Sequence, residues 1–226
     1  RQMCIRDSNS STNYYGGGMI NYTSSPMLTN CTFDGNTATA GDAGGMYNFQ
    51  GSDAVMTDCL FINNHAGGGG GMRNNDSSPT LTNCRFEGNT ASVDGGGLYN
   101  SFESELTLDG CTFISNSATR EGGGVVLLAS SLMTATNCLF ENNIAANEID
   151  GGGGVASIGS SVSLTDCTFR GNMSTGSSGE GGGLWASNSV VNVQTSTFET
   201  NSATNDDGGG CYLIGGTATI ESCQFT

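Results

Sequence analysis

The sequence predicts an all-β protein, a right-handed parallel β-helix wound as a single-stranded solenoid of about eight turns of roughly 27 residues each. Three observations predict it: a motif that recurs at this period, a glycine run between successive copies, and small or apolar residues spaced two apart in both blocks. A period near 27 residues indicates a solenoid. A spacing of two indicates that its units are strands, and none of the blocks is long enough for a helical repeat.

The recurring motif is Cys-x-Phe-x-x-Asn-x-Ala, and its first three named residues define three columns in a stacked structure. The Cys column is Cys31, Cys59, Cys84, Cys111, Cys138 and Cys167, with Ser196 in the seventh copy. The Phe column is Phe33, Phe61, Phe86, Phe113, Phe140, Phe169 and Phe198, with intervals of 25 to 29 residues. The Asn column is Asn36, Asn64, Asn89, Asn116, Asn143, Asn172 and Asn201.

Stacking turns places each residue about 4.8 Å from its copy in the next turn. We therefore expect the Cys and Phe columns to face the core, and each Asn to hydrogen-bond the Asn of the neighbouring turns, where a tight corner exposes backbone groups. The thiols favour packing as small apolar side chains. Disulfides between neighbouring turns are a second interpretation, whereas metal binding is disfavoured because no Cys-x-x-Cys spacing occurs.

Glycine accounts for 37 of the 226 residues, about twice the usual share. The glycines are concentrated in runs such as Gly95–Gly97, each followed by an apolar residue such as Leu98. This placement predicts a corner in every turn where a side chain would clash or where the backbone adopts a positive φ.

The composition excludes several classes of function. The formal charge is −15, and all six basic residues are Arg. This balance argues against nucleic acid and anionic membrane surfaces as partners. The absence of Lys excludes a Walker phosphate loop and Schiff-base chemistry, and the single His makes a histidine-based triad improbable. Since no apolar run approaches about 20 residues, we expect no membrane insertion by this segment.

Acidic residues recur just before the glycine runs, and we predict that they line one edge of the coil. They are Asp42, Asp94, Glu121, Glu180 and Asp207, four residues before the apolar residue that follows the glycines, and Asp150, one place off. Like charges about 5 Å apart favour a bound cation, and Ca²⁺ is the only cofactor that we expect here. The alternative is a solvated acidic turn.

Four aromatic residues follow the inward apolar residue by one position and are expected to face outward: Tyr47, Tyr99, Trp185 and Tyr212. An exposed aromatic column can stack on sugar rings or contact a protein. The alternative is ordinary β-propensity on an outer face.

The pairing of Phe-x-x-Asn with Gly-Gly-apolar resembles the repeat of chlamydial polymorphic outer-membrane proteins and related bacterial adhesin-like β-helices. The resemblance spans Gly16 to Phe225, although the family has Ala where this chain mostly has a third Gly. It implies a location outside the cell or on the outer-membrane surface. The partners it implies are glycans or a surface protein of a host or neighbouring cell.

The two ends depart from the repeat. We expect residues 1–8 to be a non-native leader, because this octet fits no turn. We expect residues 9–226 to be a β-helix repeat domain truncated at its C-terminal end, where Phe225 lacks its Asn. An uncapped end favours end-to-end self-association.

These features predict a non-catalytic β-helix segment that serves as a rigid stalk or adhesin surface, and we predict no catalytic residue. The alternative is a fragment of a carbohydrate-active β-helix of the polysaccharide lyase or glycosidase type. The repeats argue against it because their only basic residues besides His65 are Arg73, Arg85, Arg120 and Arg170. Their turns are also short and even, without the long loops that build a cleft.

Overall fold

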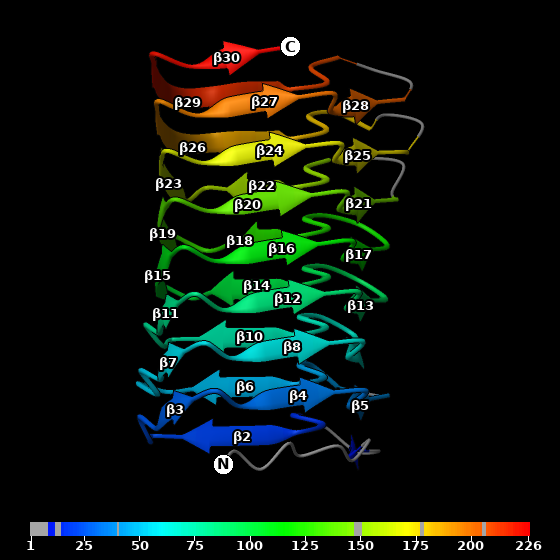
Figure 1. Cartoon of the computed structure of the whole chain (residues 1–226), viewed down its shortest axis with the longest axis vertical. Helices are drawn as coiled ribbons and strands as arrows, with labels where there is room; N and C mark the ends of the chain where they lie inside the picture. The colour runs from blue at the N-terminus through cyan, green and yellow to red at the C-terminus, as the bar shows by residue number, and fades with distance from the viewer. Residues whose placement is uncertain (1–8, 12–14, 40, 147–150, 177–178, 205–206) are drawn as a thin grey trace.

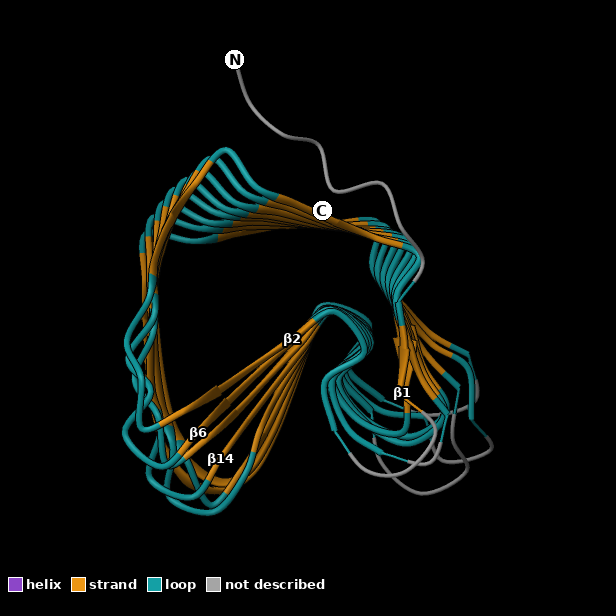
Figure 2. Ribbon diagram, turned by 90° about the horizontal axis from the view of Figure 1, so that it is seen from below, coloured by secondary structure: helices purple, strands orange, loops and turns teal. Residues whose placement is uncertain are grey.

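A coil of stacked strands, all paired in parallel, makes up the protein (Figure 1). The computed structural model describes residues 9–11, 15–39, 41–146, 151–176, 179–204 and 207–226. The predicted all-β solenoid is confirmed, since each strand pairs with its copy one turn away. Viewed along the axis, strands of one column lie over one another (Figure 2). The octet 1–8 lies outside the described residues.

The strands form three sheets. The first contains β1 (Ser10–Ser11), β5 (Thr37–Ala38), β9 (His65–Ala66), β13 (Thr90–Ala91), β17 (Ser117–Ala118), β21 (Ile144–Ala145), β25 (Met173–Ser174) and β28 (Ser202–Ala203). The second contains β4 (Thr32–Asp34), β8 (Leu60–Ile62), β12 (Arg85–Glu87), β16 (Thr112–Ile114), β20 (Leu139–Glu141), β24 (Thr168–Arg170), β27 (Thr197–Glu199) and β30 (Gln224–Phe225).

The third sheet has two strand columns that merge near the C-terminal end. One column contains β2 (Met19–Tyr22), β6 (Met46–Phe49), β10 (Met72–Asn75), β14 (Leu98–Ser101), β18 (Val125–Leu127) and β22 (Val155–Ile158). The other contains β3 (Met27–Thr29), β7 (Val55–Thr57), β11 (Thr80–Thr82), β15 (Glu105–Asp109), β19 (Leu132–Thr136) and β23 (Ser161–Thr165). The long strands β26 (Leu184–Gln194) and β29 (Cys211–Glu221) continue both columns.

The Phe column is an uninterrupted stack of rings inside the coil. From Phe33 to Phe225 neighbouring ring centroids are 4.6 to 5.1 Å apart, and the ring planes are tilted by 3 to 10°. The pairing places each Phe directly beside the next, as in Phe86 with Phe113. The prediction that this column faces the core is confirmed.

The Cys column packs beside the rings, and the eight described cysteines are free thiols. Five successive ones are buried, from Cys59 to Cys167, so the packing interpretation is confirmed. Each thiol of the column donates to the carbonyl two residues earlier, as Cys84 does to Thr82 at 3.5 Å. The Ser196 hydroxyl keeps this bond, donating to Gln194 at 2.8 Å.

The Asn column forms a buried amide ladder along the coil. The Asn64 side chain accepts bonds from the backbone and side-chain amides of Asn36, at 3.0 and 2.9 Å. Its own amide nitrogen donates to the Phe33 carbonyl and to the Asn89 side chain, both at 2.9 Å. The predicted ladder is confirmed, and it pairs the backbone groups of a corner where strand pairing is interrupted.

Left-handed backbone at the corners explains further positions of the repeat. The residue before each Cys and before each Asn of the two columns has a positive φ, as Asn83 and Asn63 do at 51° and 53°. Asn, Asp and Gly tolerate this conformation best. In the glycine run, a Cβ on Gly97 would lie 2.6 Å from the Gly124 carbonyl oxygen and 3.1 Å from the Phe113 ring. Glycine is therefore needed for the close approach of one turn to the next.

We predict that Asn116→Ala lowers the free energy of unfolding by about 3 kcal/mol or more, because it leaves buried amide and carbonyl groups of the neighbouring turns unpaired. Asn192→Ala, at an exposed position of β26, is the matched control and should cost less than about 0.5 kcal/mol. Denaturant midpoints compare the two variants. Equal losses would show that the ladder contributes nothing specific.

Candidate functional site

Three acidic side chains of the predicted edge bind separate polar partners. Asp42 pairs with Arg73 at 2.9 Å, and Asp94 pairs with Arg120 at 2.6 Å. The Glu180 carboxylate accepts a bond from the Trp185 indole at 3.1 Å. Glu121 is buried and Asp207 is exposed, whereas Asp150 lies outside the described residues.

No group of three acidic, Cys or His side chains suited to holding a metal occurs within the described residues. Calcium binding along the edge stays a prediction, which the melting temperature in a calcium titration can check.

The side chain of Arg73 extends to the place where the acidic column is interrupted. Gly68 stands there instead of an acid, and a Cβ at Gly68 would lie 3.3 Å from Nη1 of Arg73. The guanidinium therefore fills the space that an acidic side chain has in other turns. It also lies over the Tyr99 ring, 4.2 Å from the centroid, which is a cation–π contact. Only 13% of the Arg73 side chain is exposed.

Two acids and two arginines from successive turns line a pocket of about 470 Å³. Its lining residues are Tyr15, Thr39, Gly41, Asp42, Gly67, Gly68, Arg73, Val93, Asp94, Tyr99 and Arg120. Sequence reasoning identified Asp42, Asp94 and Tyr99 but did not bring them together with the arginines. The sequence does contain a signal for this pairing. Gly68 replaces the acidic residue of the column and leaves room there for a long side chain from a nearby position.

Burial and hydrogen bonding shift the pKa values of two groups in this pocket. Burial raises the pKa of the Asp42 carboxyl above its ordinary value of 3.8, although Arg73 beside it acts in the opposite direction. The hydrogen bond to Asp94 raises the pKa of the Arg120 guanidinium, so this arginine is charged at any physiological pH.

The prediction of an exposed aromatic column is wrong for two of its members. Tyr47 and Trp185 are only 5% and 4% exposed, while Tyr99 and Tyr212 are half-buried. Tyr99, Trp185 and Tyr212 do lie outside the main core, in a second apolar cluster around Val126.

The loops that carry the glycine runs turn back over this face (Figure 2). A Cβ on Gly95 would lie 3.0 Å from that of Tyr99. The loops therefore cover the side chains that strand alternation alone leaves exposed.

These features define a β-helix with a polar pocket on its outer surface. The chain belongs to the right-handed β-helix family, because the family described as right handed beta helix region matches residues 1–91 and 65–194. No curated protein and no solved structure matches the chain. Within its described residues, no helix has the length and apolar character needed to cross a membrane.

We predict that Asp42 makes the protein less stable as the pH rises. An acid with a raised pKa in the folded state binds more protons when folded, so its contribution is full below pH 3.8 and declines as the pH rises through the folded value. The melting temperature of Asp42→Asn relative to the natural chain should therefore increase with pH. Asp109→Asn, at an exposed position of β15, controls for the loss of one negative charge. If the melting temperature of Asp42→Asn instead decreases with pH relative to the natural chain, the ion pair with Arg73 outweighs the effect of burial on Asp42.

Proposed function

We propose that this chain is a non-catalytic β-helix segment, secreted or displayed on a bacterial surface, that acts as a rigid stalk and presents its sides for adhesion. Its family membership supports the architecture. The resemblance of its Phe-x-x-Asn and Gly-Gly repeat to chlamydial polymorphic outer-membrane proteins supports the location and the adhesive role.

The observation that carries the proposal is the unbroken register of the interior. The Phe stack continues from Phe33 to Phe225, and the amide ladder continues from Asn36 to Asn201. A coil whose turns all repeat one core resists bending between turns, which is the mechanical property that a stalk needs.

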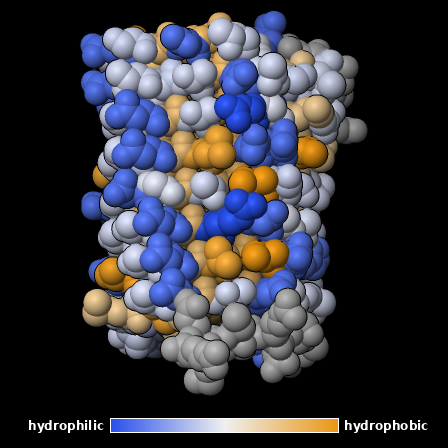
Figure 3. All heavy atoms as spheres, in the orientation of Figure 1, coloured by the Kyte–Doolittle hydropathy of each residue, from blue (hydrophilic) through white to orange (hydrophobic). Residues whose placement is uncertain are grey.

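The outer surface supports a role in contact rather than in chemistry. Bands of hydrophilic atoms separate apolar patches on the face shown in Figure 3. Two ion-pair groups lie on the second sheet: Arg85 with Glu87 at 2.9 Å, and Arg170 with Glu141 and Glu199 at 3.4 and 3.0 Å. Non-obligate protein interfaces are about as apolar as the rest of a protein surface, so a mixed surface of this kind is compatible with reversible contacts.

One observation favours the second candidate, a carbohydrate-active β-helix. The pocket around Arg73 combines two carboxylates with two guanidinium groups. Paired carboxylates cleave glycosidic bonds in most glycosidases, and guanidinium groups bind the carboxylates of an acidic chain. In this case the chain should release reducing or unsaturated ends from polygalacturonate, and Asp94→Asn should abolish the release.

The test is adhesion of particles coated with the chain. Coated beads should attach to epithelial or bacterial cells several times more often than albumin-coated beads, because many weak contacts act together on one bead. The same preparation should leave neutral and acidic polysaccharides intact. Attachment no better than that of albumin, or cleavage lost in Asp94→Asn, would overturn the proposal.

A further inference from the structure

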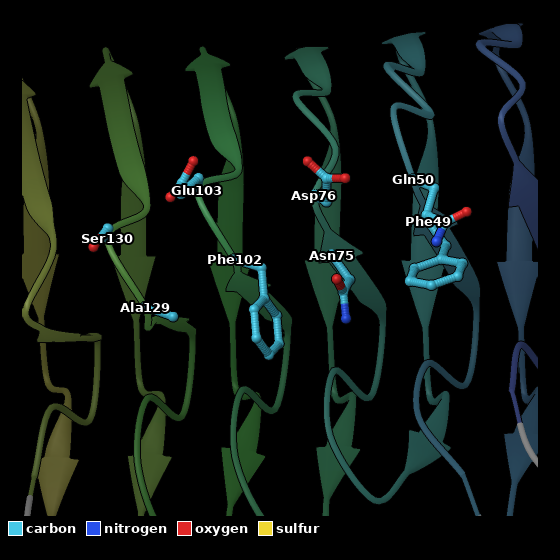
Figure 4. A pocket seen from close by; sticks show the side chains of 8 residues that line it. All are labelled: Phe49, Gln50, Asn75, Asp76, Phe102, Glu103, Ala129 and Ser130. Carbon is cyan, nitrogen blue, oxygen red and sulfur yellow. The ribbon is translucent and has the colours of Figure 1, made fainter.

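A second pocket, of about 550 Å³, lies at the corner between the two columns of the third sheet. Its lining residues are Phe49, Gln50, Asn75, Asp76, Phe102, Glu103, Ala129 and Ser130, contributed by four successive turns (Figure 4). In that view Asn75 lies between Phe49 and Phe102, and Asp76 lies between Gln50 and Glu103. The lining is thus repeated across turns along the axis.

The pocket exists because one corner is a residue shorter than its neighbours. Ser52, Ser77 and Ser104 occupy equivalent positions, since each backbone amide donates to the next hydroxyl at 3.1 and 3.0 Å. Before Ser77 the corner consists of Asp76 alone. The equivalent corners before Ser52 and Ser104 contain two residues each, Gln50–Gly51 and Phe102–Glu103. The surface is therefore recessed at Asp76.

An exposed aromatic ring borders the recess. Phe102 is 56% exposed and has a φ of 55°, a left-handed conformation that is unusual for a bulky residue and turns its side chain out of the strand pattern. On the other side, Phe49 packs against Tyr22 and Tyr47, with centroids 5.6 and 5.7 Å apart. Phe49 and Phe102 belong to turns that are two strand spacings apart along the axis, which is about 10 Å.

The carboxylates of the pocket are not neutralised within the described structure. Neither Asp76 nor Glu103 has an ion pair there. The four described arginines bind other acids: Arg73 to Asp42, Arg85 to Glu87, Arg120 to Asp94, and Arg170 to Glu141 and Glu199. The recess therefore offers carboxylate and amide groups beside aromatic rings, and no described cation lines it.

We propose that this corner pocket binds a neutral saccharide, which identifies the partner class of the adhesive surface and rests on the proposed function. The apolar C–H face of a sugar ring packs on Phe102, while Asp76, Glu103 and the Gln50 and Asn75 amides bond its hydroxyl groups. Two uncompensated carboxylates repel acidic glycans. A lysine-rich peptide would also satisfy the charges, so a basic probe belongs in the test and its binding would contradict the proposal.

Calorimetric titration of the whole chain tests the proposal with chitotetraose, mannotetraose and cellotetraose as neutral probes. Tetragalacturonate and tetralysine serve as acidic and basic probes. At least one neutral probe should bind, and Phe102→Ala and Asp76→Ala should each weaken its binding about tenfold or more. Ile144→Ala on β21 and Asp109→Ala on β15 are matched exposed controls in other strands and should bind normally.

Circular dichroism and melting temperature establish that every variant is folded. The proposal is overturned when the folded chain binds no neutral probe, when Phe102→Ala leaves the affinity unchanged, or when tetralysine binds in their place. Saccharide binding without bead adhesion overturns the proposed function alone. Adhesion that persists without saccharide binding overturns only this assignment of the partner.

Discussion

A buried amide that bonds its own copy in the next turn is the interaction on which the rest of this coil depends. From Asn64 to Asn201, each Asn of the ladder accepts a bond from a backbone amide and donates one to a Phe carbonyl, at a corner where the strands do not pair. A shift of one residue in any turn would place another side chain there and leave those groups buried and unpaired, which is costly. The ladder therefore holds every turn in one register, and the ring stack and thiol column follow from that register.

A constant interior leaves the outer corners free to vary in length. Among the turns of the amide ladder, that of residues 64–88 is the shortest, since Asn89 follows Asn64 by 25 positions. It is short at its glycine loop and again at Asp76, and each shortening coincides with a hollow on the outside. The two pockets are thus consequences of chain length at corners, produced without disturbing the core.

The sequence predicted the three inner columns residue by residue because an inward position recurs in every turn with the same chemical requirement. It failed for Tyr47 and Trp185, which strand alternation places outside but which the glycine loops cover. It also did not pair Arg73 with Asp42, since their contact joins residues of two different columns in neighbouring turns. Loop paths depend on local length and glycine geometry, and neither follows the repeat.

The sequence by itself determined the coil, its period and its core. Each turn packs on a copy of itself, so the recurrence of Phe, Asn and Cys at fixed places is enough to specify these features. The tertiary structure decided which outer side chains are covered and where the surface is hollow. It also decided that Phe102 lies beside Asp76 rather than beside another aromatic ring. The physical reason is that the core is stabilised by repetition, whereas the surface is determined by small differences between turns.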